Sequence, residues 1–119
     1  NYMKWIGHTE FGPNYIPIIN ENIYFKNAFS INHWIEQWYL TYKNCLDFYK
    51  DQTNLNFVCY EVLCKSERCW PRILKKLDIP GAYFFEFKHS KKQISESIND
   101  ELISKTDQLY SKLIDVALK

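Results

Sequence analysis

The stretch NLNFVCY, residues 54–60, decides the fold that the sequence predicts. Its apolar and aromatic residues follow the polar turn Asp51–Asn54, and a short apolar run after a turn is typical of a buried β-strand. A buried strand without neighbours would leave its backbone donors and acceptors unpaired, which is costly in free energy. We therefore expect it to pair with residues 15–19, with residues 82–87, or with a strand outside this chain.

A long amphipathic helix is predicted before this strand, over residues 30–50. Ser30 suits the N-cap position, where its side chain can accept a hydrogen bond from the first turn. Residues 1–29 are rich in Gly, Pro and Asn and are predicted to form a loop. Apolar residues recur at intervals of three and four, which places them on one helix face. They are Ile31, Trp34, Ile35, Trp38, Tyr42, Cys45, Leu46 and Tyr49.

Two further helices are predicted after the strand, over residues 66–78 and 99–118. Pro71 falls in the first turn of the former, where its missing N–H costs little. Asn99 or Asp100 caps the latter. Together these elements describe an α/β fragment, mostly helical with one or two short strands, in a single partial domain over residues 1–119. The apolar faces consist of Trp70, Ile73, Leu74 and Leu77, and of Leu102, Leu109, Tyr110, Leu113, Ile114 and Ala117.

The composition argues against several classes of function. The 119 residues carry 15 basic and 14 acidic side chains, a net charge of +1, and this balance argues against a nucleic-acid or anionic-membrane surface. No apolar run is long enough to cross a bilayer. Eight Phe, nine Tyr and four Trp are many for so short a chain, so these rings either fill a dense core or contact a neighbour.

The four cysteines are predicted to be free thiols. Three of them have C-x4-C-x4-C spacing, which differs from the close pairs of zinc sites, and no second pair follows. His33 and His89 are poorly placed to complete a metal site. Because His33 lies off the apolar face, we expect it to be partly exposed. Reduced thiols favour a cytoplasmic location. The cysteines are Cys45, Cys59, Cys64 and Cys69.

The order of motifs along the chain resembles the C-terminal half of the sulfotransferase family. In that family a strand ends in Tyr-Glu-x-Leu, matched here by residues 60–63. A helix then ends in a Leu-Gly-Ile-Pro-like phrase, matched by residues 73–80. The last helix of the family carries Leu-Tyr-x-x-Leu, matched by residues 109–113. Residues 3–12 also look like the loop that follows the 3′-phosphate-binding segment in some bacterial members.

The resemblance implies an enzyme that transfers a sulfuryl group from 3′-phosphoadenosine 5′-phosphosulfate to a hydroxyl or amine. It also implies a parallel sheet related to that of P-loop NTPases, of which this chain supplies the C-terminal half. Tyr60 would contact the adenine of the cofactor. Lys91 and Lys92, which follow Lys88 and His89, would contact a phosphate. The Arg-Lys-Gly phrase of the family is absent from this basic stretch, so a solvated loop is the alternative.

The residues that would perform the chemistry are not found in this sequence. It has no G-x4-G-K-[ST] pattern, and its three glycines cannot form a phosphate-cradling loop. We therefore assign no catalytic residue and no metal ligand. We expect a missing N-terminal part of the same fold to supply the chemistry, and the fragment alone to be inactive.

Several patterns leave two interpretations open. Tyr60 is either a cofactor contact or a core tyrosine, and His8 with Glu10 forms either a general-base pair or an ordinary loop contact. Trp34 and Trp38, one helical turn apart, either stack on a sugar acceptor or pack in the core. The sequence also fits another class of protein, a small helix-rich protein-interaction (adaptor) domain without enzymatic activity.

Overall fold

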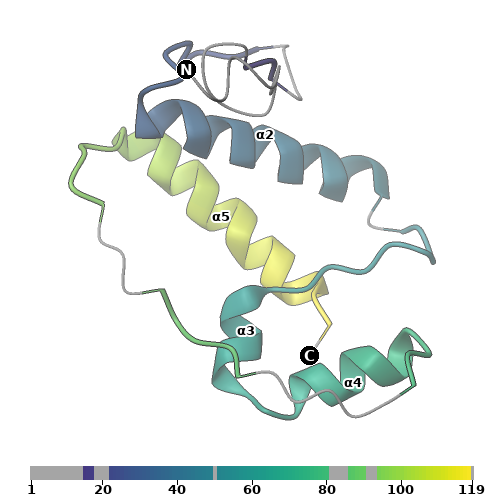
Figure 1. Cartoon of the computed structure of the whole chain (residues 1–119). Coiled ribbons are helices and arrows are strands. Elements are labelled where there is room, and N and C mark those ends of the chain that lie inside the picture. Colours follow the sequence, from purple (N-terminus) through teal and green to yellow (C-terminus); the bar gives the residue numbers. More distant parts are fainter. Residues whose placement is uncertain (1–14, 18–21, 50, 81–85, 91–93, 119) are drawn as a thin grey trace.

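The computed structural model describes residues 15–17, 22–49, 51–80, 86–90 and 94–118. In this part of the chain all regular structure is helical (Figure 1). The helices are α2 (Ile31–Tyr49), α3 (Tyr60–Lys65), α4 (Cys69–Lys76) and α5 (Asp100–Val116). Helices α2 and α5 pack against each other, and α3 packs against α4 near the C-terminal end of α5 (Figure 1). The mostly helical character predicted from the sequence is confirmed.

The two long helices start at residues that satisfy their first backbone N–H groups. The hydroxyl of Ser30 accepts a hydrogen bond from the backbone N–H of Asn32 at 3.3 Å. The side chain of Asn99 accepts one from the N–H of Leu102 at 3.0 Å. Two acidic residues in the first turn of α5 also suit the positive end of its dipole. These local signals explain why the sequence indicates both helix starts.

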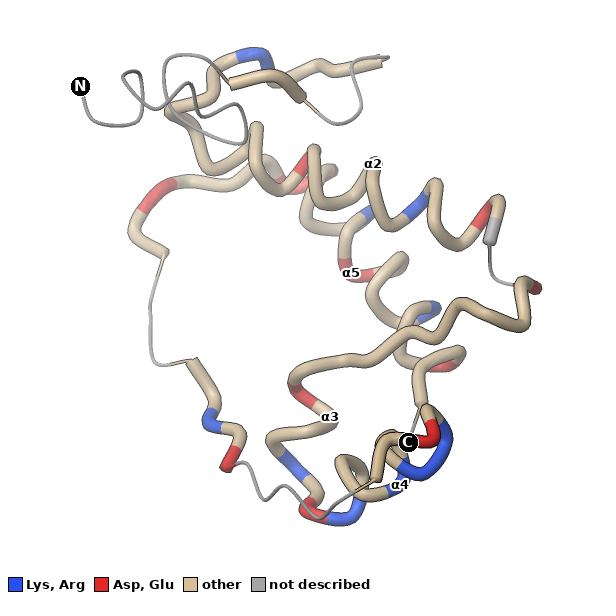
Figure 2. Tube along the Cα trace, turned by 45° about the vertical axis from the view of Figure 1, so that its right-hand side comes forward, with Lys and Arg blue, Asp and Glu red and all other residues tan. Residues whose placement is uncertain are grey.

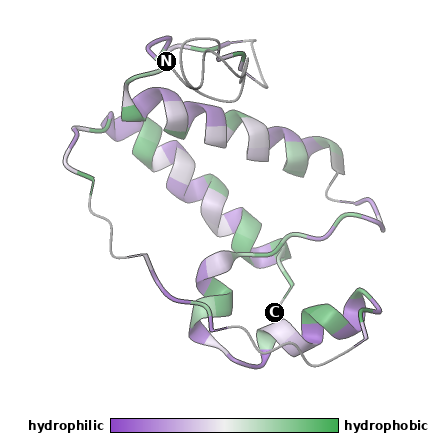
Figure 3. Ribbon diagram, viewed as in Figure 1, coloured by the Kyte–Doolittle hydropathy of each residue, from purple (hydrophilic) through white to green (hydrophobic). Residues whose placement is uncertain are grey.

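The main core lies between α2 and α5, and residues just before α3 complete it. Figure 3 shows hydrophobic and hydrophilic residues side by side along both long helices, as expected where one face is buried. The buried members of this core are Leu46, Cys59, Leu109, Leu113 and Ala117. A smaller cluster joins α3 to α4, and its buried members are Leu63, Cys69 and Ile73.

The prediction of a strand at residues 54–60 is wrong. The backbone carbonyl of Phe57 accepts a hydrogen bond from the N–H of Leu118 at 2.9 Å, which ties this segment to the end of α5 rather than to a sheet. Phe57 and Cys59 pack against the main core, whereas Val58 between them is exposed. Buried and exposed side chains thus alternate along this segment with a period of two residues, as they do in a strand. This shared period explains why the sequence predicted a strand here.

The expected partners of that strand do not form strands where they are described. Residues 15–17 and 86–87 have no regular structure, and residues 18–19 and 82–85 lie outside the described residues. A parallel sheet is therefore not supported by the described part of the chain.

Helix α3 occupies residues for which the sequence predicts the end of a strand and a link. Tyr60 begins α3 directly after Cys59, whose backbone is extended (φ −94°, ψ 121°). The helix has six residues, which is too short for a helical period to show in the sequence. It is held by tertiary packing, since Leu63 packs beside Ile73 of α4 in the smaller cluster.

Candidate functional site

The candidate site begins at Tyr60, the first residue of α3. Its hydroxyl donates a hydrogen bond to the backbone carbonyl of Lys88 at 2.9 Å. Its ring meets that of Phe87 edge to face, with centroids 5.9 Å apart, and Phe87 meets Trp70 of α4 in the same way at 5.5 Å. The residue is nevertheless 49% exposed. Packing thus fixes the position of the ring while half of its surface stays open to solvent.

The structure brings part of the predicted basic stretch to Tyr60. Lys88 forms an ion pair with Glu86 at 3.1 Å, and both side chains are exposed, so this pair contributes little to stability. Lys91 and Lys92, the predicted phosphate contacts, lie outside the described residues. In the described part, Figure 2 shows acidic and basic residues interspersed, with basic residues gathered at α4, whose last turn carries Lys75 and Lys76.

A carboxylate–tyrosine pair connects α3 to α5 next to this site. The hydroxyl of Tyr110 donates a hydrogen bond to Glu61 Oε2 at 2.6 Å. This bond is the largest cause that holds the pKa of Glu61 below its usual value, and the positive charges of His89 and Lys65 act in the same direction. Burial, followed by the bond to Glu61, raises the pKa of Tyr110. The pair is therefore ordered with its proton on Tyr110.

We expect Tyr110→Phe to destabilise the chain at neutral pH and much less in acid. Because folding lowers the pKa of Glu61, its contribution to stability is present above the unfolded-state pKa and is lost as pH falls through the folded-state pKa. Urea unfolding followed by circular dichroism at neutral and acidic pH measures this. Tyr42→Phe, which keeps a ring beside Trp38, is the matched control. An equal loss of stability for Tyr110→Phe at both pH values would contradict the coupling.

Several other predicted site residues take ordinary structural places. Trp38 packs against the main core and lies 4.7 Å from Tyr42, centroid to centroid, which supports the core interpretation of this residue. Trp34 donates a hydrogen bond from its indole N–H to the carbonyl of Ala28 at 3.0 Å. His8 and Glu10 lie outside the described residues. None of the four cysteines forms a disulfide, and the described residues contain no cluster of three potential metal ligands.

The sequence analysis missed a set of three buried polar side chains on α2. His33, predicted to be partly exposed, is only 3% exposed, and Glu36 and Gln37 are buried beside it on the same helix. Both carboxylate oxygens of Glu36 accept hydrogen bonds from the backbone N–H of Tyr24, at 3.0 and 3.1 Å, and one also accepts from the N–H of Phe25 at 2.7 Å. These side chains lie off the apolar face of α2. They are buried because the segment before α2 packs over them, and the sequence pattern of the helix does not show this packing.

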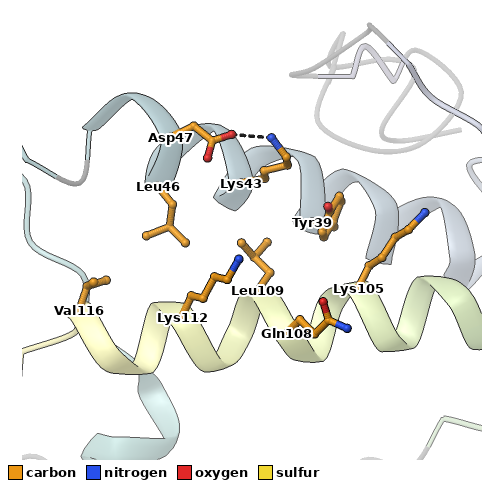
Figure 4. A pocket seen from close by; sticks show the side chains of 9 residues that line it. All are labelled: Tyr39, Lys43, Leu46, Asp47, Lys105, Gln108, Leu109, Lys112 and Val116. Carbon is orange, nitrogen blue, oxygen red and sulfur yellow. Dashed lines mark hydrogen bonds and ion pairs between the residues drawn. The ribbon is translucent and has the colours of Figure 1, made fainter.

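An open groove of about 370 Å3 runs between α2 and α5 (Figure 4). Leu46, Leu109 and Val116 provide its apolar part, and Lys112 points from α5 toward α2. Two other lysines of the rim are neutralised within their own helices, Lys43 by Asp47 and Lys105 by Glu101. The groove therefore lacks a concentrated charge that would select a ligand.

The comparisons with known proteins give no relative. No family model, no curated protein and no solved structure matches this chain. The described part contains no helix that is both long and apolar enough to cross a membrane. Any functional assignment therefore rests on the residues of this chain alone.

Proposed function

We propose that this chain is the C-terminal part of a cytoplasmic sulfotransferase. The enzyme would transfer a sulfuryl group from 3′-phosphoadenosine 5′-phosphosulfate to a hydroxyl or amine. In this proposal Tyr60 contacts the adenine, and Lys91 and Lys92 contact a phosphate. A Gly-rich phosphate loop and the catalytic base belong to a preceding part of the same fold.

The position of Tyr60 is the observation that carries the proposal. The backbone is extended at Cys59 and becomes helical at Tyr60, so the ring stands at the first residue of α3. The hydrogen bond to the Lys88 carbonyl places the start of the basic stretch beside the ring. A half-exposed aromatic ring next to basic residues suits an adenine nucleotide, which offers a flat base and anionic phosphates.

The extent of exposed surface is consistent with a chain that packs against further structure. Among the described residues, large apolar side chains just before α3 are exposed, Leu55 at 38% and Val58 at 43%. In the proposed enzyme, the preceding part of the fold would cover some of this surface.

The proposal predicts a longer coding sequence that includes this chain, and that sequence is its first test. The residues that precede Asn1 there must contain a strand, a Gly-rich loop and a helix. The longer polypeptide must transfer radiolabelled sulfate from the cofactor to at least one acceptor in a panel of phenols, sugars and amines. A coding sequence without such a loop, or a folded product without transfer, would refute it.

Within that polypeptide, Tyr60→Ala is expected to raise the KM for 3′-phosphoadenosine 5′-phosphosulfate about tenfold, because stacking of a base on an aromatic ring contributes about 1–3 kcal/mol. Initial rates at varied cofactor concentration measure this. Tyr60→Phe keeps the ring and loses only the bond to the Lys88 carbonyl, so its KM should change little. Equal effects of the two substitutions would show that the hydroxyl, rather than the ring, matters.

A second candidate is a helix-rich protein-interaction domain without enzymatic activity. Exposed aromatic side chains favour it, since Phe29 is 88% and Tyr24 81% exposed near the start of α2, and Phe48 is exposed near its end. Large exposed aromatic residues are typical of surfaces that bind another protein. This candidate predicts that the longer polypeptide shows no sulfate transfer, and that Phe29→Ser weakens complex formation without lowering stability.

A further inference from the structure

Two buried side chains on α2 present polar atoms that are not hydrogen-bonded. His33 and Gln37 are 3% and 7% exposed, and their spacing of four residues places them on one face of the helix. Within the described part of the chain, His33 Nε2 and both polar atoms of the Gln37 carboxamide have no hydrogen-bond partner. Buried polar groups without partners lower stability, so two neighbouring ones indicate that something else binds there.

The surroundings of His33 determine what its free nitrogen can do. His33 Nδ1 lies 2.5 Å from the backbone carbonyl oxygen of Phe25. A carbonyl oxygen only accepts, so Nδ1 carries a hydrogen and donates it to Phe25. In the neutral ring Nε2 then has a lone pair and acts as an acceptor. A ligand at this position must therefore donate a hydrogen bond to His33.

Gln37 adds a second requirement, because its carboxamide offers a donor and an acceptor. A metal cation cannot accept from the amide N–H2 group, and an anion without a proton, such as sulfate, cannot donate to His33 Nε2. Both oxygens of the neighbouring Glu36 are already bound to backbone N–H groups. Hydroxyl groups donate and accept at once, so a neutral ligand with several hydroxyls satisfies every unpaired atom.

Aromatic rings border the same pair. The centroid of the His33 ring lies 5.2 Å from that of Tyr15 and 5.3 Å from that of Trp34, and the Tyr15 and Trp34 centroids are 4.9 Å apart. A few convergent polar groups among aromatic side chains are typical of small-molecule sites. We propose that His33 and Gln37 bind neighbouring hydroxyl groups of a neutral polyol such as a sugar. This inference does not depend on the proposed sulfotransferase function.

The test is a titration of the full chain, labelled with 15N, with D-glucose and with myo-inositol, monitored by NMR. We expect the resonances of His33 Nε2 and of the Gln37 side-chain amide to shift and to saturate with at least one of these polyols. Sodium sulfate and sodium acetate should cause no saturable shift, because neither anion donates a hydrogen bond at neutral pH. If neither polyol shifts both groups, a bound water or no ligand occupies the pair and the proposal is overturned.

A substitution separates a ligand site from a structural role. Gln37→Met keeps a similar length and removes both unpaired atoms, so polyol affinity should fall about tenfold, the effect of losing a hydrogen bond. The same change should raise the melting temperature of the free chain by a few degrees, since the buried amide has no partner. The control is Gln108→Met, at an exposed position of α5, which should alter neither the polyol affinity nor the melting temperature. A lower melting temperature or unchanged affinity for Gln37→Met would overturn the proposal.

Discussion

Leu113→Ala is expected to lower the free energy of unfolding by about 3 kcal/mol, the usual effect of emptying a buried leucine site. Leu113 is only 3% exposed, and it packs with Leu46 of α2 and Leu109 of α5 in the main core. This core joins α2, α5 and the segment before α3. A cavity at Leu113 therefore weakens the packing among all three elements. Urea unfolding followed by circular dichroism measures the change.

Ile103→Ala is the matched control, because Ile103 lies on the same helix but is partly exposed. Its cost should stay below about 1 kcal/mol. Equal losses for the two substitutions would mean that the face of α5 that packs on α2 is assigned incorrectly.

Glu36→Gln is expected to destabilise the chain by about 1.5–3 kcal/mol, the usual contribution of hydrogen bonds to a charged group. The carboxylate accepts from the backbone N–H groups of Tyr24 and Phe25 and so ties the segment before α2 to that helix. A carboxamide of the same size has one acceptor oxygen, and its N–H2 group would face backbone donors. Urea unfolding measures the loss, and hydrogen exchange should show faster exchange at the amides of Tyr24 and Phe25.

The control for this substitution is Glu67→Gln, which removes one negative charge from an exposed position between α3 and α4. It should change stability by less than about 0.5 kcal/mol. If exchange at Tyr24 and Phe25 is as slow in Glu36→Gln as in the original chain, the carboxylate does not hold this segment.

The sequence indicates the parts of the fold that depend on neighbouring residues. Helices α2 and α5 follow from apolar residues repeated at helical intervals and from caps a few residues away, Ser30 and Asn99. Those signals act within one or two turns, so no knowledge of the rest of the chain is needed. The sequence likewise shows Tyr60 at the end of an apolar run, but it does not predict that Tyr60 begins helix α3.

Only the tertiary structure decided the rest, because those features depend on residues far apart in the chain. The apolar alternation at Phe57 and Cys59 fits a strand or a segment that crosses α5, and the hydrogen bond from Leu118 favours the crossing. His33 looks like a surface residue on its own helix, yet it is buried and bonded to Phe25. A sequence pattern indicates which residues are apolar and should be buried. Which element packs over them depends on contacts across the whole fold.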